Sequence, residues 1–396
     1  MSERPLDVEV AVIGLGIMGA CSLWRVATRG VSAAGFDRHH PPHAFGSSHG
    51  HSRMLRKVQF EGDAYVPLVK LAYRLWSELE RDAGETVFNR TGLLILGPPD
   101  SQLIRGAVES SLATGVDHEL LETASIRARY PQHVVAAGDR AVFDPVAGYV
   151  SPERAITAAL ASAEALGAEV RRGCEVRSLS VGDGAVVLET TTGPIRARTA
   201  VVAAGAWLGT LVPELAPAIK LERHFFCWVP VRDRSAYAPL AFPMFIREND
   251  ARSGTAIEES HAHRDRIASY GFPLDGAEDR IKVGFPVTGV PADSPAVDRR
   301  PRTEELAAVR RLTETLVGVG AEPYGFTPCV YDNSPDGDFL IGGVRSRPGV
   351  TVLGGFSGAG FKHATAVGEI AAALANGEPS PVDIARWSPE RFLRRE

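Results

Sequence analysis

Cysteine and lysine are both scarce in this chain of 396 residues. The four cysteines are widely separated and form no CxxC pair, lying at positions 21, 174, 227 and 329. This spacing indicates neither a disulfide framework nor a zinc site, and we predict no bound metal. Only five of the 43 basic residues are lysines, at positions 57, 70, 220, 282 and 362, and arginine supplies the rest. Because the composition avoids lysine, each lysine that remains is a candidate for a specific role.

The chain also lacks an excess of positive charge and a long apolar segment. Its formal net charge is -5 at pH 7, which leaves no general basic field for nucleic acid. The charged residues 1–7 lead into the apolar stretch 8–13, which is too short for the core of a signal peptide or for a membrane span. We therefore expect a cytoplasmic protein with neither a nucleic acid nor a membrane partner. Hydrophobic content of 44% is typical of soluble proteins, and the length predicts about two domains.

A glycine-rich turn near the N-terminus is the clearest local motif. The β-branched run 8–13 is followed by a GxGxxG spacing at Gly14, Gly16 and Gly19. An apolar-periodic helix comes next, and then a second strand that ends at Asp37. The N–H groups and positive dipole end of that helix suit a pyrophosphate, and the acid suits a ribose hydroxyl. The pattern predicts dinucleotide binding, argues against a 2′-phosphate that Asp37 would repel, and does not separate NAD from FAD.

The rest of the chain indicates a discontinuous nucleotide domain. Ser-Pro-Glu at 151–153 predicts the start of a helix that ends at Gly167. Two alternating runs with glycine-containing turns then indicate a β-meander, and the run 200–204 has the character of a buried strand. Two stretches of different character interrupt these segments. We predict an α/β nucleotide-binding domain formed by residues 1–88, 150–217 and 324–396, and a substrate domain formed by residues 89–149 and 218–323.

Three separated motifs resemble one family of flavoenzymes. They are the segment 46–56, Cys329 with Tyr331, and the glycine-rich run 354–362. In this order, over nearly the whole chain, they are similar to the monomeric sarcosine oxidase and N-methyltryptophan oxidase family. The resemblance implies a glutathione-reductase-type, Rossmann-like FAD domain with an antiparallel α+β substrate domain. It also implies FAD held covalently through Cys329, which matches the cysteine that forms a thioether to the flavin in that family.

The spacing of these motifs agrees with a flavin site. Cys329 and Tyr331 are two residues apart, so on a strand they project to the same face. A lone cysteine in a β-rich run is more often a packing residue, so the attachment rests on the resemblance. The glycines between 354 and 360 would let the backbone approach the flavin and aim N–H groups at its pyrimidine edge.

Two arginines and two lysines are the main candidates for the chemistry. Arg53 and Arg56 are three apart and would share one face of a helical turn, where arginines more often form structural salt bridges. By the resemblance, Arg56 and Lys362 would clamp a substrate carboxylate, which suits a guanidinium fork and a compact ammonium. Lys282 would match the family lysine that activates dioxygen above the flavin.

The resemblance therefore assigns the following residues. Catalytic roles are expected for Lys282, Arg53, His49 and Tyr331, and substrate contacts for Arg56, Lys362, Tyr270 and Phe272. Contacts with the cofactor are expected for Gly14, Gly16, Ile17, Met18, Gly19, Asp37, Arg38, Ser47, Ser48, Arg53, Val176, Ala204, Gly205, Trp207, Cys329, Gly358, Ala359, Gly360 and Lys362.

The sequence departs from the family pattern at two places. Pro286 stands where members acting on sarcosine or N-methyltryptophan have a histidine, so that polar contact is lost. The polar segment 249–268 is longer than in the family and contains His261 and His263, which we interpret as surface residues, the alternative being a lid or substrate reader. These departures leave the flavin chemistry in place and put the substrate in question.

We predict an oxidase of a secondary amino acid, either N-alkyl or cyclic. Hydride transfer to the flavin would give an imine, and dioxygen would reoxidise the flavin to give hydrogen peroxide. The expected partners are a small amine substrate and dioxygen, and the protein is expected to be a monomer. One alternative is a dehydrogenase or tailoring enzyme for a bulkier amine-containing biosynthetic intermediate. Another is a catalytically silent flavoprotein, against which the retained Arg56, Lys282 and Lys362 argue.

Overall fold

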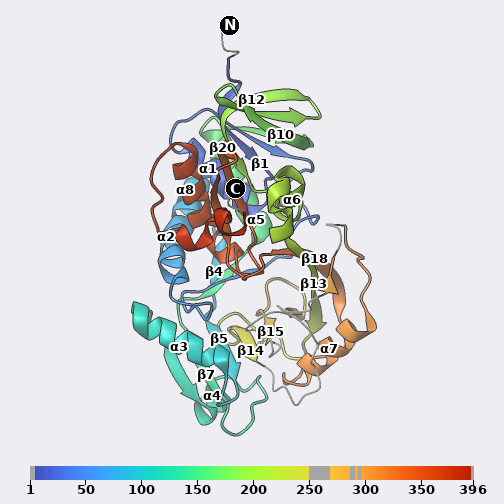
Figure 1. Cartoon of the computed structure of the whole chain (residues 1–396). Coiled ribbons are helices and arrows are strands. Elements are labelled where there is room, and N and C mark those ends of the chain that lie inside the picture. The colour runs from blue at the N-terminus through green and yellow to red at the C-terminus, as the bar shows by residue number, and fades with distance from the viewer. Residues whose placement is uncertain (1–4, 249–267, 286–289, 293–295, 394–396) are drawn as a thin grey trace.

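The computed structural model describes residues 5–248, 268–285, 290–292 and 296–393. Within these residues the strands form an eight-stranded, a nine-stranded and a three-stranded sheet. The eight-stranded sheet lies in the upper half of Figure 1, and the nine-stranded sheet lies in the lower half. The predicted α/β fold with a Rossmann-like domain and a largely antiparallel second sheet is confirmed.

The upper sheet is built around β1 (Val8–Ile13), which pairs in parallel with a strand on each side. Its parallel strands, in spatial order, are β9 (Glu169–Arg172), β2 (Ala33–Asp37), β1, β12 (Gly193–Val202) and β20 (Arg347–Gly354). Along β1, Val10 and Val12 pack into one hydrophobic cluster, whereas Ala11 and Ile13 pack into another. Both faces of the sheet are therefore buried, as is usual for parallel strands.

Antiparallel strands complete this sheet at its edges. β10 (Val176–Gly182) and β11 (Ala185–Thr190) pair with each other, and β11 pairs with the first half of β12. The β-meander predicted from the sequence is thus confirmed. On the same side of β12, β20 is followed by β19 (Leu340–Val344), which pairs with it antiparallel.

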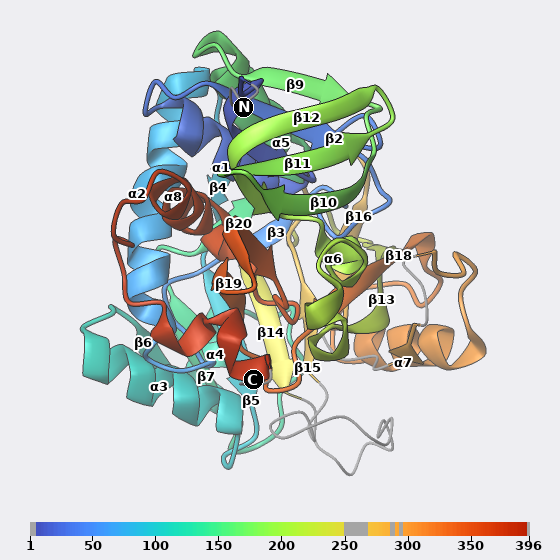
Figure 2. The same ribbon diagram turned by 45° about the horizontal axis from the view of Figure 1, so that its top comes forward.

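Four helices cover one face of the upper sheet (Figure 2): α1 (Ile17–Ala27), α2 (Tyr65–Ala83), α5 (Pro152–Ala165) and α8 (Ala364–Ala375). α1 packs against α5 and α8, and a Cβ added at Gly368 of α8 would lie 2.6 Å from the carbonyl carbon of Cys21. The Arg25 guanidinium links three of the helices through ion pairs of 2.5 Å with Glu78 and 2.5 Å with Glu369.

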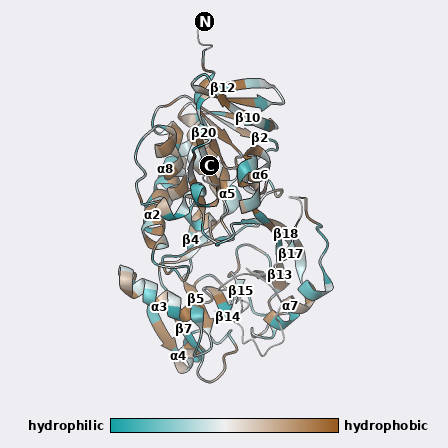
Figure 3. Cartoon of the chain, in the orientation of Figure 1, coloured by the Kyte–Doolittle hydropathy of each residue, from teal (hydrophilic) through white to brown (hydrophobic). Residues whose placement is uncertain are grey.

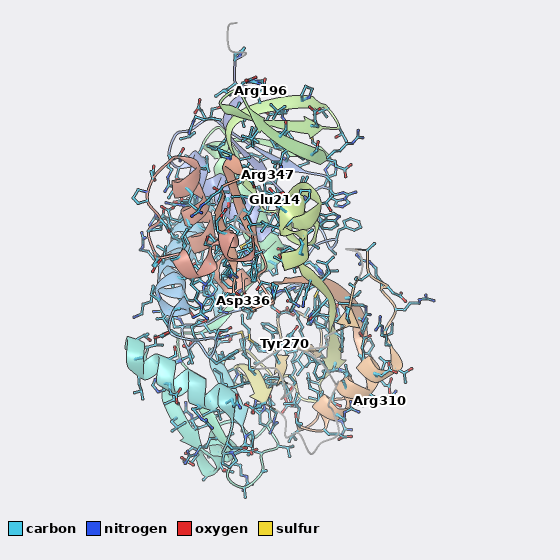
Figure 4. All side chains as sticks on the ribbon, viewed as in Figure 1. Arg196, Glu214, Tyr270, Arg310, Asp336 and Arg347 are labelled. Carbon is cyan, nitrogen blue, oxygen red and sulfur yellow. The ribbon has the colours of Figure 1, made fainter. Side chains whose placement is uncertain are left out.

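The opposite face of the upper sheet is covered by short helical turns around α6 (Leu208–Leu211). An ion pair ties this layer to the sheet, because Arg347 Nε of β20 lies 2.5 Å from Glu214 Oε1 (Figure 4). The hydropathy colouring of Figure 3 shows apolar stretches in α8 and in the strand β5 (Leu93–Gly97) of the lower half.

The nine-stranded sheet is antiparallel except where β14 pairs in parallel with β5. Its strands, in spatial order, are β17 (Val290–Pro291), β13 (Lys220–Pro230), β16 (Arg280–Gly284), β15 (Ala268–Gly271), β14 (Met244–Glu248), β5, β7 (Arg140–Asp144) and β6 (Glu119–Glu122), with β18 (Tyr324–Asn333) also paired to β13. The helices α3 (Gln102–Thr114), α4 (Thr123–Arg129) and α7 (Thr303–Thr313) belong to this half.

The predicted domain limits do not coincide with the sheets. The limit at residue 324 assigns β18 to the nucleotide domain, whereas β18 is hydrogen-bonded along its length to β13 of the lower sheet. The small sheet of β3 (Arg53–Leu55), β8 (Gly148–Val150) and β4 (Phe88–Arg90) spans the limits near 88 and 149. Hydrogen bonding to a neighbouring strand, and not proximity in the chain, decides to which sheet a strand belongs. The division into two domains stays a proposal.

Candidate cofactor and substrate site

A cavity of about 370 Å³ opens at the ends of the parallel strands of the upper sheet. It is lined by the glycine turn after β1, the end of β2 and the loop that follows, the turn after β12, and the glycine-rich segment after β20. Cavities outside the carboxyl ends of parallel strands are the usual place for a ligand in such folds. The cavity is therefore the candidate cofactor site.

The glycine turn brings the start of α1 to this cavity. Gly14 has φ +86°, and a Cβ there would lie 2.6 Å from the carbonyl oxygen of Ala203. The residue before the helix is Gly16, which has no side chain to cap it, and the Ile17 N–H donates to Ser48 Oγ at 3.2 Å. The positive end of the helix dipole thus lies beside the cavity, where it favours an anion such as a pyrophosphate.

Asp37 stands at the end of β2 and lines the same cavity. Its carboxylate accepts the N–H of Leu15 at 2.9 Å and the N–H of His39 at 2.8 Å, and His43 Nε2 lies 3.3 Å away. Burial opposes ionisation, but the hydrogen bonds from His43 and these backbone groups lower the pKa of Asp37. The carboxylate is therefore ionised, and it also fixes the glycine turn to the neighbouring strand.

Most of the residues expected to contact a cofactor line the cavity. These are Gly14, Gly16, Ile17, Met18, Asp37, Arg38, Ser47, Ser48, Arg53, Val176, Ala204, Gly205, Trp207, Gly358 and Gly360. Gly19, Ala359, Cys329 and Lys362 are not among its lining residues. Gly19 has a different position, because a Cβ there would lie 1.7 Å from the carbonyl oxygen of Gly14. It allows α1 to pack on the turn.

Sequence reasoning missed two acidic residues that line the cavity, Glu175 and the buried Asp332. Asp332 follows Tyr331 in β18, and its carboxylate accepts the N–H of Gly355 at 2.9 Å. Burial raises the pKa of Asp332 to about 6. Its place beside Tyr331 in the motif was the available signal, although an acid in a strand is ordinarily exposed.

Cys329 and Tyr331 lie on the same face of β18, as their spacing predicted. Both pack in a cluster with Phe226 and Trp228 of β13. Tyr331 lines the cavity, and a Cβ at Gly358 would lie 2.6 Å from Tyr331 Cε2. Burial raises the pKa of the Cys329 thiol, although the charges of Arg53 and Lys282 oppose this.

Arg53 and Arg56 do not share a helical turn, and that expectation was wrong. Arg53 begins the strand β3, and Arg56 follows the end of this strand. Residues three apart on an extended chain face opposite sides. Accordingly, Arg53 Nη2 donates to the carbonyl of Ser47 at 3.1 Å beside the cavity, whereas Arg56 Nη1 donates to the carbonyl of Val58 at 2.5 Å.

The structure brings Arg56 and Lys362 together around a carboxylate of the chain itself, Glu61. Glu61 Oε1 accepts from Arg56 Nη2 at 2.5 Å and from Lys362 Nζ at 3.0 Å. Burial opposes ionisation of Glu61, but the Arg56 and Lys362 charges hold its pKa well below its usual range. Burial lowers the pKa of Lys362 to about 8, with Glu61 opposing this shift and Arg56 adding to it. Sequence reasoning missed Glu61, because an acid in a polar loop carries no distinguishing pattern.

Lys282 is buried in β16 and is held by one turn of the chain. Its Nζ donates to the carbonyls of Gly50 at 2.7 Å and Ser52 at 2.6 Å, and it lies 4.3 Å from the ring centroid of Phe226. Burial and the charge of Arg53 lower the pKa of Lys282 well below its usual value. His49 directly precedes this turn. Burial and the charges of Arg53 and Lys282 lower the pKa of His49 to about 3, so its imidazole is neutral.

Tyr270 and Phe272 lie near these groups but do not line the cavity. Figure 4 shows Tyr270 between the two halves of the molecule. Burial raises the pKa of Tyr270, and the Phe272 ring lies 4.8 Å from Lys282 Nζ. Pro286, His261 and His263 fall outside the described residues, as does the segment 249–267.

Comparison with known proteins agrees with this geometry. Residues 9–374 match the family described as FAD dependent oxidoreductase. The chain belongs to this family. N-methyl-L-tryptophan oxidase of Yersinia pestis (strain Pestoides F) is 33% identical over 394 residues, which cover 98% of this chain and 100% of that protein. N-methyl-L-tryptophan oxidase of Yersinia pseudotuberculosis serotype O:1b (strain IP 31758) gives the same values. The resemblance inferred from the motifs is confirmed, and the protein is an FAD-dependent oxidoreductase.

Solved structures show the same fold. NikD, described as an unusual amino acid oxidase essential for nikkomycin biosynthesis, is similar with a TM-score of 0.82, 22% identity, and coverage of 97% of this chain and 98% of that one. L-proline dehydrogenase from P. horikoshii has a TM-score of 0.80 at 22% identity, covering 99% of this chain and 100% of that one. Glycine oxidase from Geobacillus kaustophilus has a TM-score of 0.78 at 20% identity, covering 98% and 99%.

The cavity suits the FAD of this oxidoreductase family. The α1 dipole and the Gly14 turn lie where a pyrophosphate requires donors, and Asp37 lies where a ribose requires an acceptor. At the other end of the cavity, a Cβ at position 358 would collide with Tyr331. Gly358 would therefore let the backbone approach a bound flavin closely. Within the described residues, no group of three or more His, Cys, Asp or Glu side chains could hold a metal ion. In the same part of the chain, no helix is long and apolar enough to cross a membrane.

Proposed function

We propose that this FAD-dependent oxidoreductase oxidises an amino acid with a secondary amino group, either N-alkyl or cyclic, to an imine with release of hydrogen peroxide. The observation that carries the proposal is the pair of buried cations Arg56 and Lys362, which share the single carboxylate of Glu61. These groups follow the cavity-lining residues Arg53 and Phe361 closely in the chain. Two cations with one directly paired anion are suited to a second carboxylate, that of a substrate.

The geometry supports a clamp for a carboxylate. The Arg56 and Lys362 side chains are 4% and 5% exposed, so their charges are poorly screened by water. Burial has already lowered the pKa of Lys362 to about 8, which shows that its charge is incompletely balanced. A guanidinium binds a carboxylate through two parallel hydrogen bonds, and an ammonium adds a compact second charge. An anionic ligand at this place would restore that balance.

Other residues of the chain orient the substrate and support the reaction with dioxygen. When bound, FAD would accept a hydride from the carbon beside the amine nitrogen and pass the electrons to dioxygen. The buried ring of Phe272 and the partly buried ring of Tyr270 would exclude water, and Tyr331, Arg53 and His49 would surround the reacting end of the cavity. Lys282 would supply a fixed positive charge that stabilises superoxide as it forms.

We also propose that Cys329 attaches the flavin covalently. The support is its motif and its place beside the cavity-lining Tyr331 on one strand face. Acid-precipitated wild-type protein should stay yellow, and Cys329→Ser protein should release the colour into the supernatant. A colourless pellet from the wild type would rule out the attachment.

The test of the proposed function is peroxide release with a panel of N-alkyl amino acids, cyclic imino acids and their decarboxylated amine counterparts. We expect activity only where a carboxylate is present. Arg56→Ala and Lys362→Met should each weaken substrate binding by about 2–5 kcal/mol, the range for removing one partner of a desolvated charge pair. Lys57→Met is the matched control, because it removes a lysine that is next to Arg56 in the chain but outside the proposed clamp. The Lys57 side chain lies over the Tyr73 ring, with Nζ 4.9 Å from the ring centroid.

Two outcomes would contradict the proposal. Unchanged affinity in both clamp variants, or a preferred substrate without a carboxylate, would show that Arg56 and Lys362 have another purpose. Oxidation of the amine with transfer of electrons to a dye, and no peroxide, would favour the dehydrogenase or tailoring enzyme for a bulkier intermediate.

A further inference from the structure

The turn that holds Lys282 consists of residues 50–52. The described residues give Lys282 Nζ three hydrogen bonds, to Gly50 O at 2.7 Å, Ser52 O at 2.6 Å and Ser52 Oγ at 3.4 Å. All three acceptors belong to this turn, whose carbonyl dipoles therefore face one buried ammonium. The position of that charge depends on the conformation of the turn.

The turn has a backbone conformation that needs support from outside. Gly50 has φ +97°, and a Cβ there would lie 2.1 Å from Phe226 Cζ. His51, which is not glycine, has φ +66°. Such a residue is unfavourable by roughly 1–3 kcal/mol and persists only where surrounding contacts hold it. The Ser52 N–H bond to the Gly50 carbonyl at 2.8 Å lies within the turn and cannot supply that external support.

Glu153 of α5 supplies the external contact. Its Oε1 accepts the N–H of Gly50 at 2.6 Å, and its Oε2 accepts the N–H of His51 at 3.2 Å. The peptide group between Gly50 and His51 thus donates to the carboxylate and accepts from Lys282 Nζ through its carbonyl. Hydrogen bonds in such a chain polarise one another in the same direction. An acid in the first turn of a helix usually serves the helix dipole, but this one is directed at the turn that carries the Lys282 site.

Charged and titratable groups surround Lys282 on several elements. The negative charges of Glu153 and of Asp275 favour its protonated form, whereas Arg53 of β3 opposes it. Burial raises the pKa of the Cys329 thiol on β18, so this group is uncharged, and the neighbouring His49 is neutral as well. Of the two carboxylates, Glu153 is the one hydrogen-bonded to the turn that binds the ammonium.

We propose that Glu153 is a positioning residue for the Lys282 ammonium, holding the turn 50–52 so that the carbonyls of Gly50 and Ser52 face Nζ. The inference rests on the proposed function only in that it takes Lys282 to serve the reaction of the reduced enzyme with dioxygen. The link between Glu153 and Lys282 itself is a statement about the protein, and it can be tested without turnover.

The first experiment follows the titration of Lys282 directly. With five lysines in the chain, lysine-selective 13C and 15N labelling gives a spectrum in which the loss of one signal in Lys282→Met assigns this residue. In Glu153→Gln, which keeps an acceptor and removes the charge, the titration midpoint of Lys282 should fall by about one pH unit. Glu153→Asp, which keeps the charge, should restore most of that shift. Glu164→Gln is the control on the same helix, because Glu164 pairs with the distant Arg172 at 2.9 Å.

The second experiment measures the two half-reactions of the holoenzyme by rapid mixing across pH. In Glu153→Gln, reoxidation by dioxygen should be lost at a lower pH than in the wild type, and the difference should equal the shift in the Lys282 titration midpoint. The rate of flavin reduction by substrate should stay within about twofold of the wild-type rate. An unchanged Lys282 midpoint in both Glu153→Gln and Glu153→Ala would overturn the proposal, even if stability were reduced. Fast reoxidation in Lys282→Met would instead refute the oxygen role of Lys282, and the titration would still decide whether Glu153 positions it.

Discussion

Lys362 is the residue whose protonation should be visible in ligand binding. Burial lowers its pKa to about 8, so the ammonium is present below this pH and is lost as the pH rises through it. A bound carboxylate needs the charged form. The affinity for a carboxylate that cannot be oxidised, such as cyclopentanecarboxylate, should therefore be constant below pH 8 and fall up to about tenfold per pH unit above it.

Titration of the flavin absorbance with this ligand between pH 6.5 and 9.5 measures the effect. Lys362→Met should bind more weakly and should show no such pH dependence. The Lys57→Met control should follow the wild type. Affinity that stays constant up to pH 9.5 in the wild type would show that Lys362 is not a ligand of the carboxylate.

At the residue scale, motif reasoning found the cations and missed the acids Glu61 and Glu153, one of which pairs with two of the cations and the other with the turn that holds Lys282. Arg56, Lys362 and Lys282 are recognisable because they stand in motifs and because lysine is rare. Glu61 follows no pattern, and Glu153 was recognised only as the acid of a helix start, which says nothing of its contact with the turn 50–52. Their importance comes from the groups that they contact, at 2.5 Å from Arg56 and 2.6 Å from the Gly50 N–H.

At the scale of elements, the contact between the glycine turn and α1 is the most demanding. A Cβ at Gly19 would lie 1.7 Å from the Gly14 carbonyl oxygen, so the helix would have to move away from the turn. Gly19→Ala should lower the free energy of unfolding by about 1–3 kcal/mol, as overpacking in a core does, and should reduce the FAD content of the purified protein.

Denaturant unfolding and the ratio of flavin to protein absorbance measure these two effects. Gly182→Ala is the matched control, because a Cβ there meets nothing within 4 Å. Should Gly19→Ala keep wild-type stability and full flavin content, the packing of α1 on the turn would not be what holds the cofactor end of the helix.

The elements themselves were predicted with unequal success. The strand, glycine turn, helix and strand at the N-terminus were predicted because each is specified by local periodicity and by glycine. The helical turn expected around Arg53 is a strand, β3, since pairing with β8 overrides the local spacing. The limit at residue 324 separated β18 from the sheet to which it is hydrogen-bonded, because pairing between distant strands leaves no local mark.

At the scale of the whole molecule, the cofactor cavity should couple distant parts of the chain. Its lining residues extend from Ile13 to Phe361 and include segments of both the first and the last thirds of the sequence. A ligand that binds only the folded state stabilises it by about 2.7 kcal/mol at a hundred times its dissociation constant. Cys329→Ser protein, in which the flavin can exchange, should therefore show a melting temperature that rises with added FAD.

Thermal unfolding of this variant, stripped of flavin and titrated with FAD, tests the coupling. Asp37→Asn in the same background should need more FAD for the same shift, because the ionised acceptor at the ribose position is lost. A melting temperature that does not respond to FAD would mean that the cavity is not the cofactor site.

The sequence by itself determined the nucleotide-binding turn, the order of the motifs and the family to which they belong. These features depend on residues close together in the chain, where backbone period, glycine positions and spacing specify the outcome. Tertiary structure alone decided that Glu61 lies between Arg56 and Lys362, because Glu61 and Lys362 are separated by 301 positions in the chain. It also decided that Glu153 holds the Lys282 turn across 103 positions. Contacts of this kind arise only when packed helices and paired strands bring remote segments together, so no local pattern in the chain records them.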